Sequence, residues 1–146
     1  MSLCYINGAF QPKEKTSIPV SDYIILRGVG VFESICTFRK RPLMLTPHLE
    51  RLARSAESAS IALPLPVDEI KDITREGISR MKEDCLVRPF ITGGDIFHQG
   101  AFPASRFFTL FEKVQKPSPE VYDKGVLLMP VDGGRHTPGV KRVDYM

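Results

Sequence analysis

Residues 45–58 read LTPHLERLARSAES, and this stretch decides the fold because it joins a helix start to one apolar stripe. Thr46 fits the N-cap position, and Pro47 fits the first helical position, where the main chain needs no N–H donor. Apolar residues then recur at the i, i+3, i+4, i+7 spacing of a helix face: Leu49, Leu52, Ala53 and Ala56. The pattern predicts an amphipathic helix over residues 46–58.

Arg51 is the residue of this helix that we consider first as a candidate binding residue. At about 100° per residue, His48, Arg51 and Ser55 fall beside the apolar stripe, while Glu50 falls on the outer face. An arginine at the boundary of a buried face can hold a phosphate or a carboxylate with two parallel hydrogen bonds. The helix alone also allows the plainer interpretation, an arginine whose stem covers apolar surface while its head reaches water.

The composition describes one domain's worth of chain: 146 residues, 42% hydrophobic and 25% charged. With 20 basic and 17 acidic residues, the net charge is only +3, which does not indicate nucleic acid or an acidic membrane as a partner. Cys4, Cys36 and Cys85 lie far apart without metal-ligand spacing, so we expect no metal site and three free, buried thiols in a reducing cytosol. No apolar run reaches the roughly 20 residues of a membrane span, which favours a cytoplasmic α/β (α+β-like) protein.

Periodicity and turn residues predict the remaining elements. Asn7-Gly8 between two short apolar runs is typical of a β-hairpin. A second amphipathic helix is expected over Val67–Lys82, and Gly93–Ser105 is expected to be a long functional or mobile loop. The expected strands or extended segments are Leu3–Ile6, Ala9–Gln11, Thr16–Val20, Val31–Phe38, Leu43–Leu45, Leu86–Thr92, Arg106–Phe111 and Gly125–Val131.

The segment Val31–Phe38 is apolar on both alternations except at Glu33, which predicts a central strand covered on both faces. We interpret Glu33 as structural, holding a buried arginine. Gly28 and Gly30 precede this strand and allow a sharp bend or a close approach of the backbone. They do not form a dinucleotide fingerprint, because no GxGxxG opens a helix here.

Four segments, taken in order, resemble the class IV aminotransferases, the pyridoxal-phosphate enzymes of fold type IV. This family includes branched-chain aminotransferases, D-amino-acid aminotransferases and 4-amino-4-deoxychorismate lyases. The segments are Asp22 with RGVGVFE at 27–33, HLERL at 48–52 with Ser55-Ala56, VRPF at 87–90 leading into TGGD at 92–95, and PGVK at 138–141 continuing to Tyr145. Each segment alone is weak evidence, but their order and separations together are fairly specific. The resemblance covers nearly the whole chain and only the N-terminal half of the family's architecture.

The resemblance assigns cofactor roles to three residues. Arg51 takes the place of the arginine that grips the phosphate of pyridoxal 5′-phosphate, and Lys141 takes the place of the catalytic Schiff-base lysine. Tyr145 matches a residue that supports the ring hydroxyl of the cofactor. The chemistry fits these residue types, because a neutral lysine amine attacks an aldehyde and then moves a proton, while an arginine anchors the anion. Taken alone, Lys141 would be interpreted as an exposed lysine near the end of the sequence.

The resemblance also assigns substrate binding to Arg88, Arg27 and Phe32. Arg88 matches an arginine that helps bind the substrate carboxylate in the branched-chain group, although an arginine in a strand is more often a paired surface residue. Arg27 stands five residues before Phe32, where many relatives have an aromatic residue that approaches the substrate. The acid recognised by this chain is therefore expected to be unusual, or Arg27 itself binds a carboxylate.

The implied reaction is amino transfer between an amino acid and a 2-oxo acid, with a homodimer as the family's usual assembly. We expect a small α/β domain over residues 1–116, with an antiparallel-rich sheet and two packed helices, a linker over 117–124, and an incomplete large domain over 125–146. The rest of that domain would supply a glutamate for the cofactor's ring nitrogen and further phosphate ligands, so the 146-residue chain alone is expected to be inactive. Two alternatives stay open: a lyase acting on aminodeoxychorismate, and a truncated non-catalytic module that pairs with another chain.

Overall fold

The computed structural model describes residues 2–131, 133–134 and 137–144. Its strands are β1 (Leu3–Ile6), β2 (Ala9–Pro12), β3 (Gly30–Phe32), β4 (Ile35–Phe38), β5 (Arg41–Pro42), β6 (Cys85–Thr92) and β7 (Arg106–Lys113). Its α-helices are α1 (Tyr23–Arg27), α2 (Leu45–Ser58), α3 (Val67–Arg80) and α4 (Pro119–Lys124), and a short 3-10 turn covers Lys13–Lys15. None of the described helices is long and apolar enough to cross a membrane.

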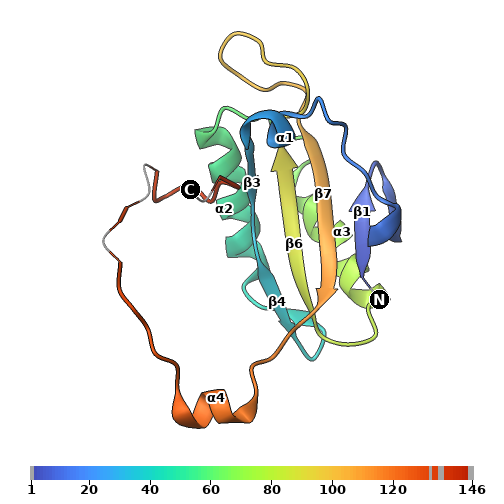
Figure 1. The fold of residues 1–146 in the computed structure, drawn as a ribbon. Helices are drawn as coiled ribbons and strands as arrows, with labels where there is room; N and C mark the ends of the chain where they lie inside the picture. Colours follow the sequence, from blue (N-terminus) through green and yellow to red (C-terminus); the bar gives the residue numbers. More distant parts are fainter. Residues whose placement is uncertain (1, 132, 135–136, 145–146) are drawn as a thin grey trace.

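The strands form one sheet in which each described pairing between named strands is antiparallel. The order is β2-β1-β7-β6-β4-β5, and β3 also pairs with β6. Helices α2 and α3 cover one face of this sheet, as Figure 1 shows, and the main apolar core lies between them and the strands. The predicted architecture, an antiparallel-rich sheet with two packed helices, is confirmed.

The predicted central strand Val31–Phe38 is divided into β3 and β4, although both parts share one register against β6. The division falls opposite Pro89: the Glu33 N–H donates to the Pro89 carbonyl at 3.0 Å, but proline has no N–H for the reciprocal bond. The prediction that both faces are covered is wrong. Cys36 is exposed and Phe38 is 59% exposed, because these alternate residues point away from the helices.

Helix α2 begins one residue earlier than the sequence predicted. The first hydrogen bond of the helix runs from the His48 N–H to the Met44 carbonyl at 3.1 Å, so Met44 is the N-cap and Thr46 is not. Leu45 is therefore helical instead of ending a short return strand over Leu43–Leu45, and the return strand is β5. Pro47 remains in the first turn, where a missing N–H costs no helical hydrogen bond.

Helix α3 packs on the centre of the sheet through a glycine. A Cβ placed on Gly77 would lie only 2.0 Å from Cζ of Phe111, a fully buried ring on β7. The absence of a side chain therefore lets this turn of α3 approach β7 closely. The predicted apolar face of α3 is confirmed, since its members are buried: Ile70, Ile73, Thr74, Gly77, Ile78 and Met81.

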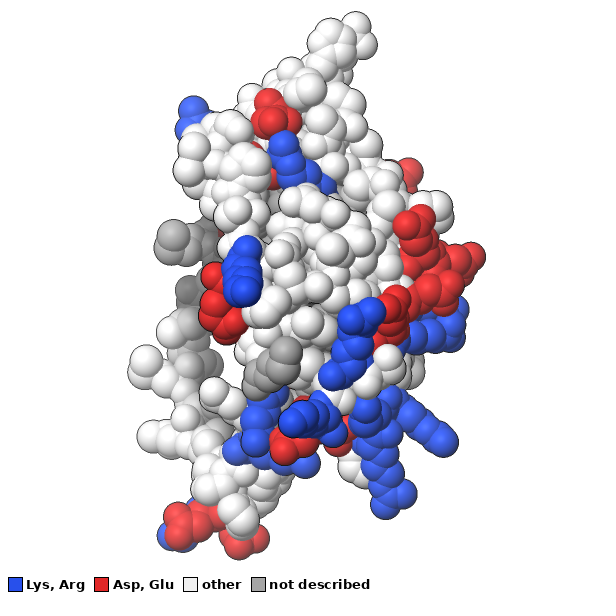
Figure 2. All heavy atoms as spheres, turned by 90° about the vertical axis from the view of Figure 1, so that its right-hand side faces the viewer, with Lys and Arg blue, Asp and Glu red and all other residues white. Residues whose placement is uncertain are grey.

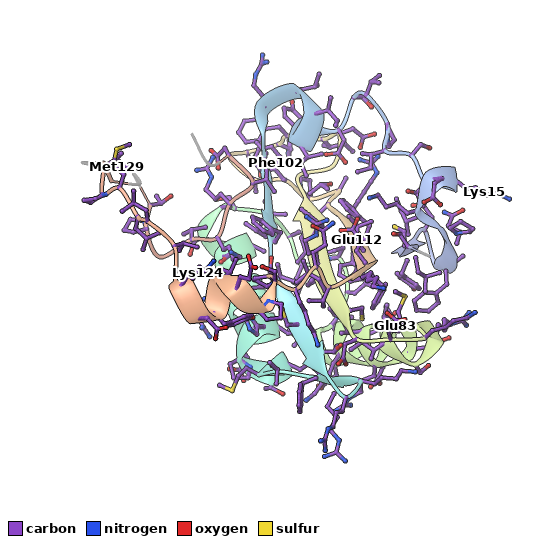
Figure 3. The ribbon with its side chains drawn as sticks, turned by 60° about the horizontal axis from the view of Figure 1, so that its bottom comes forward. Lys15, Glu83, Phe102, Glu112, Lys124 and Met129 are labelled. Atoms are coloured by element: carbon purple, nitrogen blue, oxygen red, sulfur yellow. The ribbon has the colours of Figure 1, made fainter. Side chains whose placement is uncertain are left out.

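Residues 125–131 form no strand in the described part of the chain, which contradicts the predicted strand Gly125–Val131. A strand needs main-chain hydrogen bonds to a neighbour, and within the described residues none joins 126–131 to another segment. The segment is exposed, with Leu127 at 100% and Met129 at 82%. Figure 3 shows Met129 standing away from the sheet, and Figure 1 shows the same of helix α4. Helix α4 occupies most of the stretch that the sequence predicted to be a linker.

Some of the charged side chains on the surface form ion pairs of opposite sign. On the face turned toward the viewer in Figure 2, basic and acidic groups adjoin one another along the right-hand and lower parts. Arg80 binds Glu76 at 2.6 Å one turn earlier on α3, and Lys113 at the end of β7 binds Glu83 at 3.1 Å. Such exposed pairs contribute little to stability.

Candidate functional site

The segment that carries Lys141 returns to the sheet and pairs with β3. The Phe32 N–H donates to the Lys141 carbonyl at 3.1 Å, and the Val143 N–H donates to the Gly30 carbonyl at 3.0 Å. Arg142 faces Val31 in an antiparallel bridge between these bonds. Figure 1 shows this late part of the chain beside β3 and α2. Residues more than a hundred positions apart in the sequence are thereby brought together.

Lys141 contacts both α2 and β3. Its main-chain N–H donates to the Ser55 Oγ at 3.2 Å, and Ser55 is buried on α2. Its Nζ lies 4.6 Å from the centroid of the Phe32 ring, a cation–π distance. Lys141 and Phe32 are cross-strand partners, so their side chains leave the paired strands on the same side. The amine is thus held at the edge of the sheet.

Arg51 is fixed by a buried carboxylate. Its Nε donates to Glu33 Oε1 at 2.5 Å and its Nη2 donates to Glu33 Oε2 at 2.6 Å, which makes a bidentate ion pair. His48 Nδ1 lies 2.8 Å from Glu33 Oε2 as well. Glu33 has no exposed surface, whereas the Arg51 side chain is 46% exposed. The arginine that Glu33 holds therefore still reaches solvent, and is not the fully buried arginine that the sequence suggested.

The Glu33 carboxylate is kept ionised by these partners. Burial alone would raise its pKa, but the hydrogen bonds and positive charge contributed by Arg51 and His48 outweigh burial and lower the pKa below its usual value. Glu33 lies at the junction of β3 and β4, on the face of the sheet that α2 covers. The anionic side chain at this junction therefore fixes both the Arg51 guanidinium and the His48 ring of α2.

The sheet edge brings the guanidinium of Arg51 and the Lys141 segment close together. Ser55, which accepts the Lys141 N–H, follows Arg51 by four residues on α2, a spacing that places side chains about 5–6 Å apart on one helix face. Glu33, which holds Arg51, is the next residue after Phe32, which bonds to Lys141. The main chain of Lys141 thus meets the turn of α2 that carries Arg51 at one edge of the sheet, while the Lys141 amine lies against the Phe32 ring.

Arg88 and Phe32 lie on the opposite face of the sheet, away from the two helices. The rings of Phe32, Phe90 and Phe108 form a ladder across β3, β6 and β7, with centroids 5.4 Å and 4.7 Å apart. Arg88, two residues from Phe90 on the same face, donates through Nη2 to Glu112, which Figure 3 labels. The Arg88 Nε is buried and has no hydrogen-bond partner among the described residues.

Arg27 ends helix α1 and is exposed, and its Nη1 donates to the Leu26 carbonyl at 3.0 Å. Gly28 follows as the C-cap with φ of +66°, a conformation that glycine adopts without strain. A Cβ on Gly28 would lie 3.4 Å from the Cβ of Asp144, so the Lys141 segment runs past the end of α1. Tyr145 lies outside the described residues.

Asp22 fixes helix α1 to the ends of the central strands. One of its carboxylate oxygens accepts from the Ile24 N–H at 2.9 Å, which caps the helix. The other accepts from the Thr92 hydroxyl at 2.8 Å and from Arg106 at 2.9 Å, and Arg106 also binds Asp95 at 2.9 Å. The hydrogen bond to Asp95, supported by Asp22, raises the pKa of Arg106.

Several of these contacts are not evident from the amino-acid sequence. The Asp22 cap could have been recognised from an acidic residue just before an apolar run, but nothing in the sequence marked Arg106 as its partner. Ser55 and His48 were placed beside the stripe of α2 without a role. Their partners, Lys141 and Glu33, are distant in sequence, so only the folded chain identifies the contacts.

Comparison with known proteins gives consistent results. The family model described as amino-transferase class IV matches residues 30–146. A D-alanine aminotransferase of Staphylococcus haemolyticus is 30% identical over 76 residues, which cover 52% of this chain and 27% of that protein. The chain spans about a quarter to a third of the length of the first curated relatives that it matches.

Solved structures share the fold. A branched-chain amino acid aminotransferase from T.th., complexed with 4-methylvaleric acid, is similar with a TM-score of 0.63 at 25% identity, covering 77% of this chain and 41% of that chain. An aminotransferase from Brucella abortus, bound to the cofactor PLP, reaches a TM-score of 0.72 at 19% identity, covering 82% and 44%. The second similarity is one of fold.

Proposed function

Because this chain belongs to the class IV aminotransferase family, we propose that it forms part of a pyridoxal-phosphate-dependent aminotransferase. The proposed reaction moves an amino group between an amino acid and a 2-oxo acid, and branched-chain amino acids and D-alanine are the first substrates to test. Lys141 supplies the amine that bonds to the cofactor, Arg51 holds the phosphate, and Tyr145 supports the ring. A cytoplasmic homodimer is part of the same proposal.

One observation carries the proposal: the main chain of Lys141 is bonded to Ser55, one helical turn from Arg51. Pyridoxal phosphate needs a cation for its phosphate and a primary amine for its aldehyde, within the reach of one small molecule. Arg51 and Lys141 are of these two types. Both of the group types that the cofactor needs are therefore present at this edge of the sheet.

The roles of the residues follow from their chemistry. When bound, the cofactor supplies an aldehyde that takes up the amino group and a conjugated ring that withdraws electrons from the substrate. Lys141 contributes its amine as nucleophile and then moves a proton at the substrate α-carbon. Arg51, oriented by Glu33, anchors the phosphate without taking part in bond changes. The ring of Phe32 shields the amine from water on one side.

Substrate binding is proposed for Arg88, Arg27 and Phe32. Arg88 lies on the same face as the aromatic ladder, and its buried Nε has an unused donor within the described residues. A substrate carboxylate could accept from that guanidinium in competition with Glu112. Arg27 is exposed at the end of α1, close to the chain that follows Lys141, and offers a second cation to a diacid.

Reductive trapping tests the proposal on the 146-residue chain. Pyridoxal phosphate is added, borohydride is used to fix any bond between its aldehyde and an amine, and mass spectrometry maps the labelled lysines. We expect weak labelling that favours Lys141 over Lys124, an exposed lysine of α4 in Figure 3. Lys141→Arg should abolish the favoured label, and Lys124→Arg should leave it unchanged. Equal labelling of the two lysines would contradict the proposed role of Lys141.

Activity assays separate the alternatives. The chain alone is expected to show no turnover, because no residue is assigned to the cofactor's ring nitrogen. A stable adduct with full activity on this chain would show that expectation to be wrong. In a complete protein, glutamate formed from 2-oxoglutarate and leucine or D-alanine indicates an aminotransferase, whereas pyruvate released from 4-amino-4-deoxychorismate indicates a lyase. Cofactor-free protein that pairs with another chain indicates a non-catalytic module.

A further inference from the structure

Ser55 is a polar residue within the buried face of α2. It is 2% exposed and lies between Leu52 and Ala56, which are each 1% exposed. A buried hydroxyl normally has a hydrogen-bond partner, since leaving it without one is costly. The partner that the structure describes is neither on a neighbouring turn of α2 nor on one of the named strands. It is the main-chain N–H of Lys141, at 3.2 Å.

This bond gives Lys141 two main-chain attachments on different elements. Its N–H is held by the Ser55 hydroxyl on α2, and its carbonyl accepts from the Phe32 N–H on β3. The Val143 N–H adds a third bond, to the Gly30 carbonyl. Among these three bonds, only the one to Ser55 uses a side chain. It is therefore the one that a point substitution can remove without changing the main chain.

We propose that Ser55 is a positioning residue that docks the Lys141 segment on α2 and β3 and so sets where the Lys141 amine lies. The functional meaning of this inference rests on the proposed function, in which that amine reacts. The docking itself is a property of the chain and can be measured separately. Ser55 acts through the main chain of Lys141 and needs no contact with cofactor or substrate.

Amide hydrogen exchange of the 146-residue chain measures the docking. Ser55→Ala removes one hydrogen bond worth about 1 kcal/mol, so the Lys141 amide should exchange about fivefold faster. The Leu52 amide within α2 should be unchanged, which a general weakening of the helix would not allow. Ser58→Ala, an exposed position on the same helix, should leave both amides unchanged. Val143→Pro, which deletes the donor to Gly30, should speed Lys141 exchange by an independent route.

Reductive trapping connects the docking with the amine. In Ser55→Ala, the ratio of pyridoxal-phosphate label on Lys141 to that on Lys124 should fall about fivefold, while Ser58→Ala keeps the wild-type ratio. An unchanged exchange rate at Lys141 in Ser55→Ala overturns the inference, and so does faster exchange with an unchanged label ratio. A wild-type chain that labels both lysines equally overturns the proposed function instead, while the exchange rates still decide whether Ser55 docks the segment.

Discussion

Replacing Gly77 by alanine should destabilise the domain, although the same change in most helices is stabilising. Alanine gains about 1 kcal/mol over glycine in a helix interior. At this position the added Cβ would lie 2.0, 2.3 and 2.5 Å from three ring carbons of Phe111, well inside the 3.5–4.0 Å of a normal carbon contact. Phe111 is completely buried, so its ring has no solvent to move into.

The size of the effect follows from these two terms. Overpacking a well-packed core costs roughly 1–3 kcal/mol of folding free energy, and carbon contacts this short should cost about the upper value or more. Subtracting the gain in helix propensity leaves a net loss of about 2 kcal/mol. For a chain of this length, about 3 °C of melting temperature corresponds to each kcal/mol, so the midpoint should fall by about 6 °C.

Thermal unfolding followed by circular dichroism measures this shift, with Ser79→Ala on the exposed side of α3 as the matched control. The control should keep or slightly raise the midpoint. Phe111→Leu removes the ring that the new methyl group would meet, so Gly77→Ala should cost at least about 1 kcal/mol less in that background. The reasoning is refuted if Gly77→Ala is as stable as the wild type, or if its cost is the same with leucine at position 111.

Three further predictions concern single side chains or turn positions. The pKa of Glu33 is lower in the folded chain than in the unfolded chain, where it is about 4.3. The stabilisation that Glu33 provides is therefore present above the unfolded pKa and is lost as the pH falls through the folded pKa. Glu33→Gln should flatten the decline of the urea unfolding midpoint below pH 5. Lys40→Gly should raise the melting temperature by a few degrees, since Lys40 has φ of +58° in an exposed turn. Asp84→Asn should lower it and speed amide exchange of that turn, because the Asp84 carboxylate accepts from the N–H groups of Arg39 and Lys40 at 3.1 and 2.7 Å.

The elements that depend on local pattern could be predicted from the sequence. Asn7 and Gly8 both adopt positive φ in the hairpin turn, and the last residue of α2 is Ser58 as expected. The errors arose where the outcome depends on a partner. Pro89, on another strand, divides the predicted strand Val31–Phe38, and residues 125–131 have a strand-like composition without a described neighbour to bond.

The candidate site shows the same limit. The motif containing Arg51 was visible, but its position relative to Glu33 depends on packing α2 against β3, and 17 intervening residues separate the two in the chain. Lys141 was recognised only by resemblance, because a lysine near the end of a sequence has no periodicity that marks it. The prediction of three buried thiols failed at Cys36, since alternation along β4 alone does not say which face the helices cover.

The structure divides the sheet into a half that builds the site and a half that supports it. Arg51, Glu33, Ser55 and Lys141 come from α2, β3 and the segment paired with β3, at one edge of the sheet. Strands β1 and β2 lie at the opposite edge, beyond β7 and β6. Substitutions of buried residues in β1 and β2 should therefore affect the site only by changing the stability of the whole sheet. Contacts between α2 and β3 act on it directly, because both proposed cofactor residues are held by the same two elements.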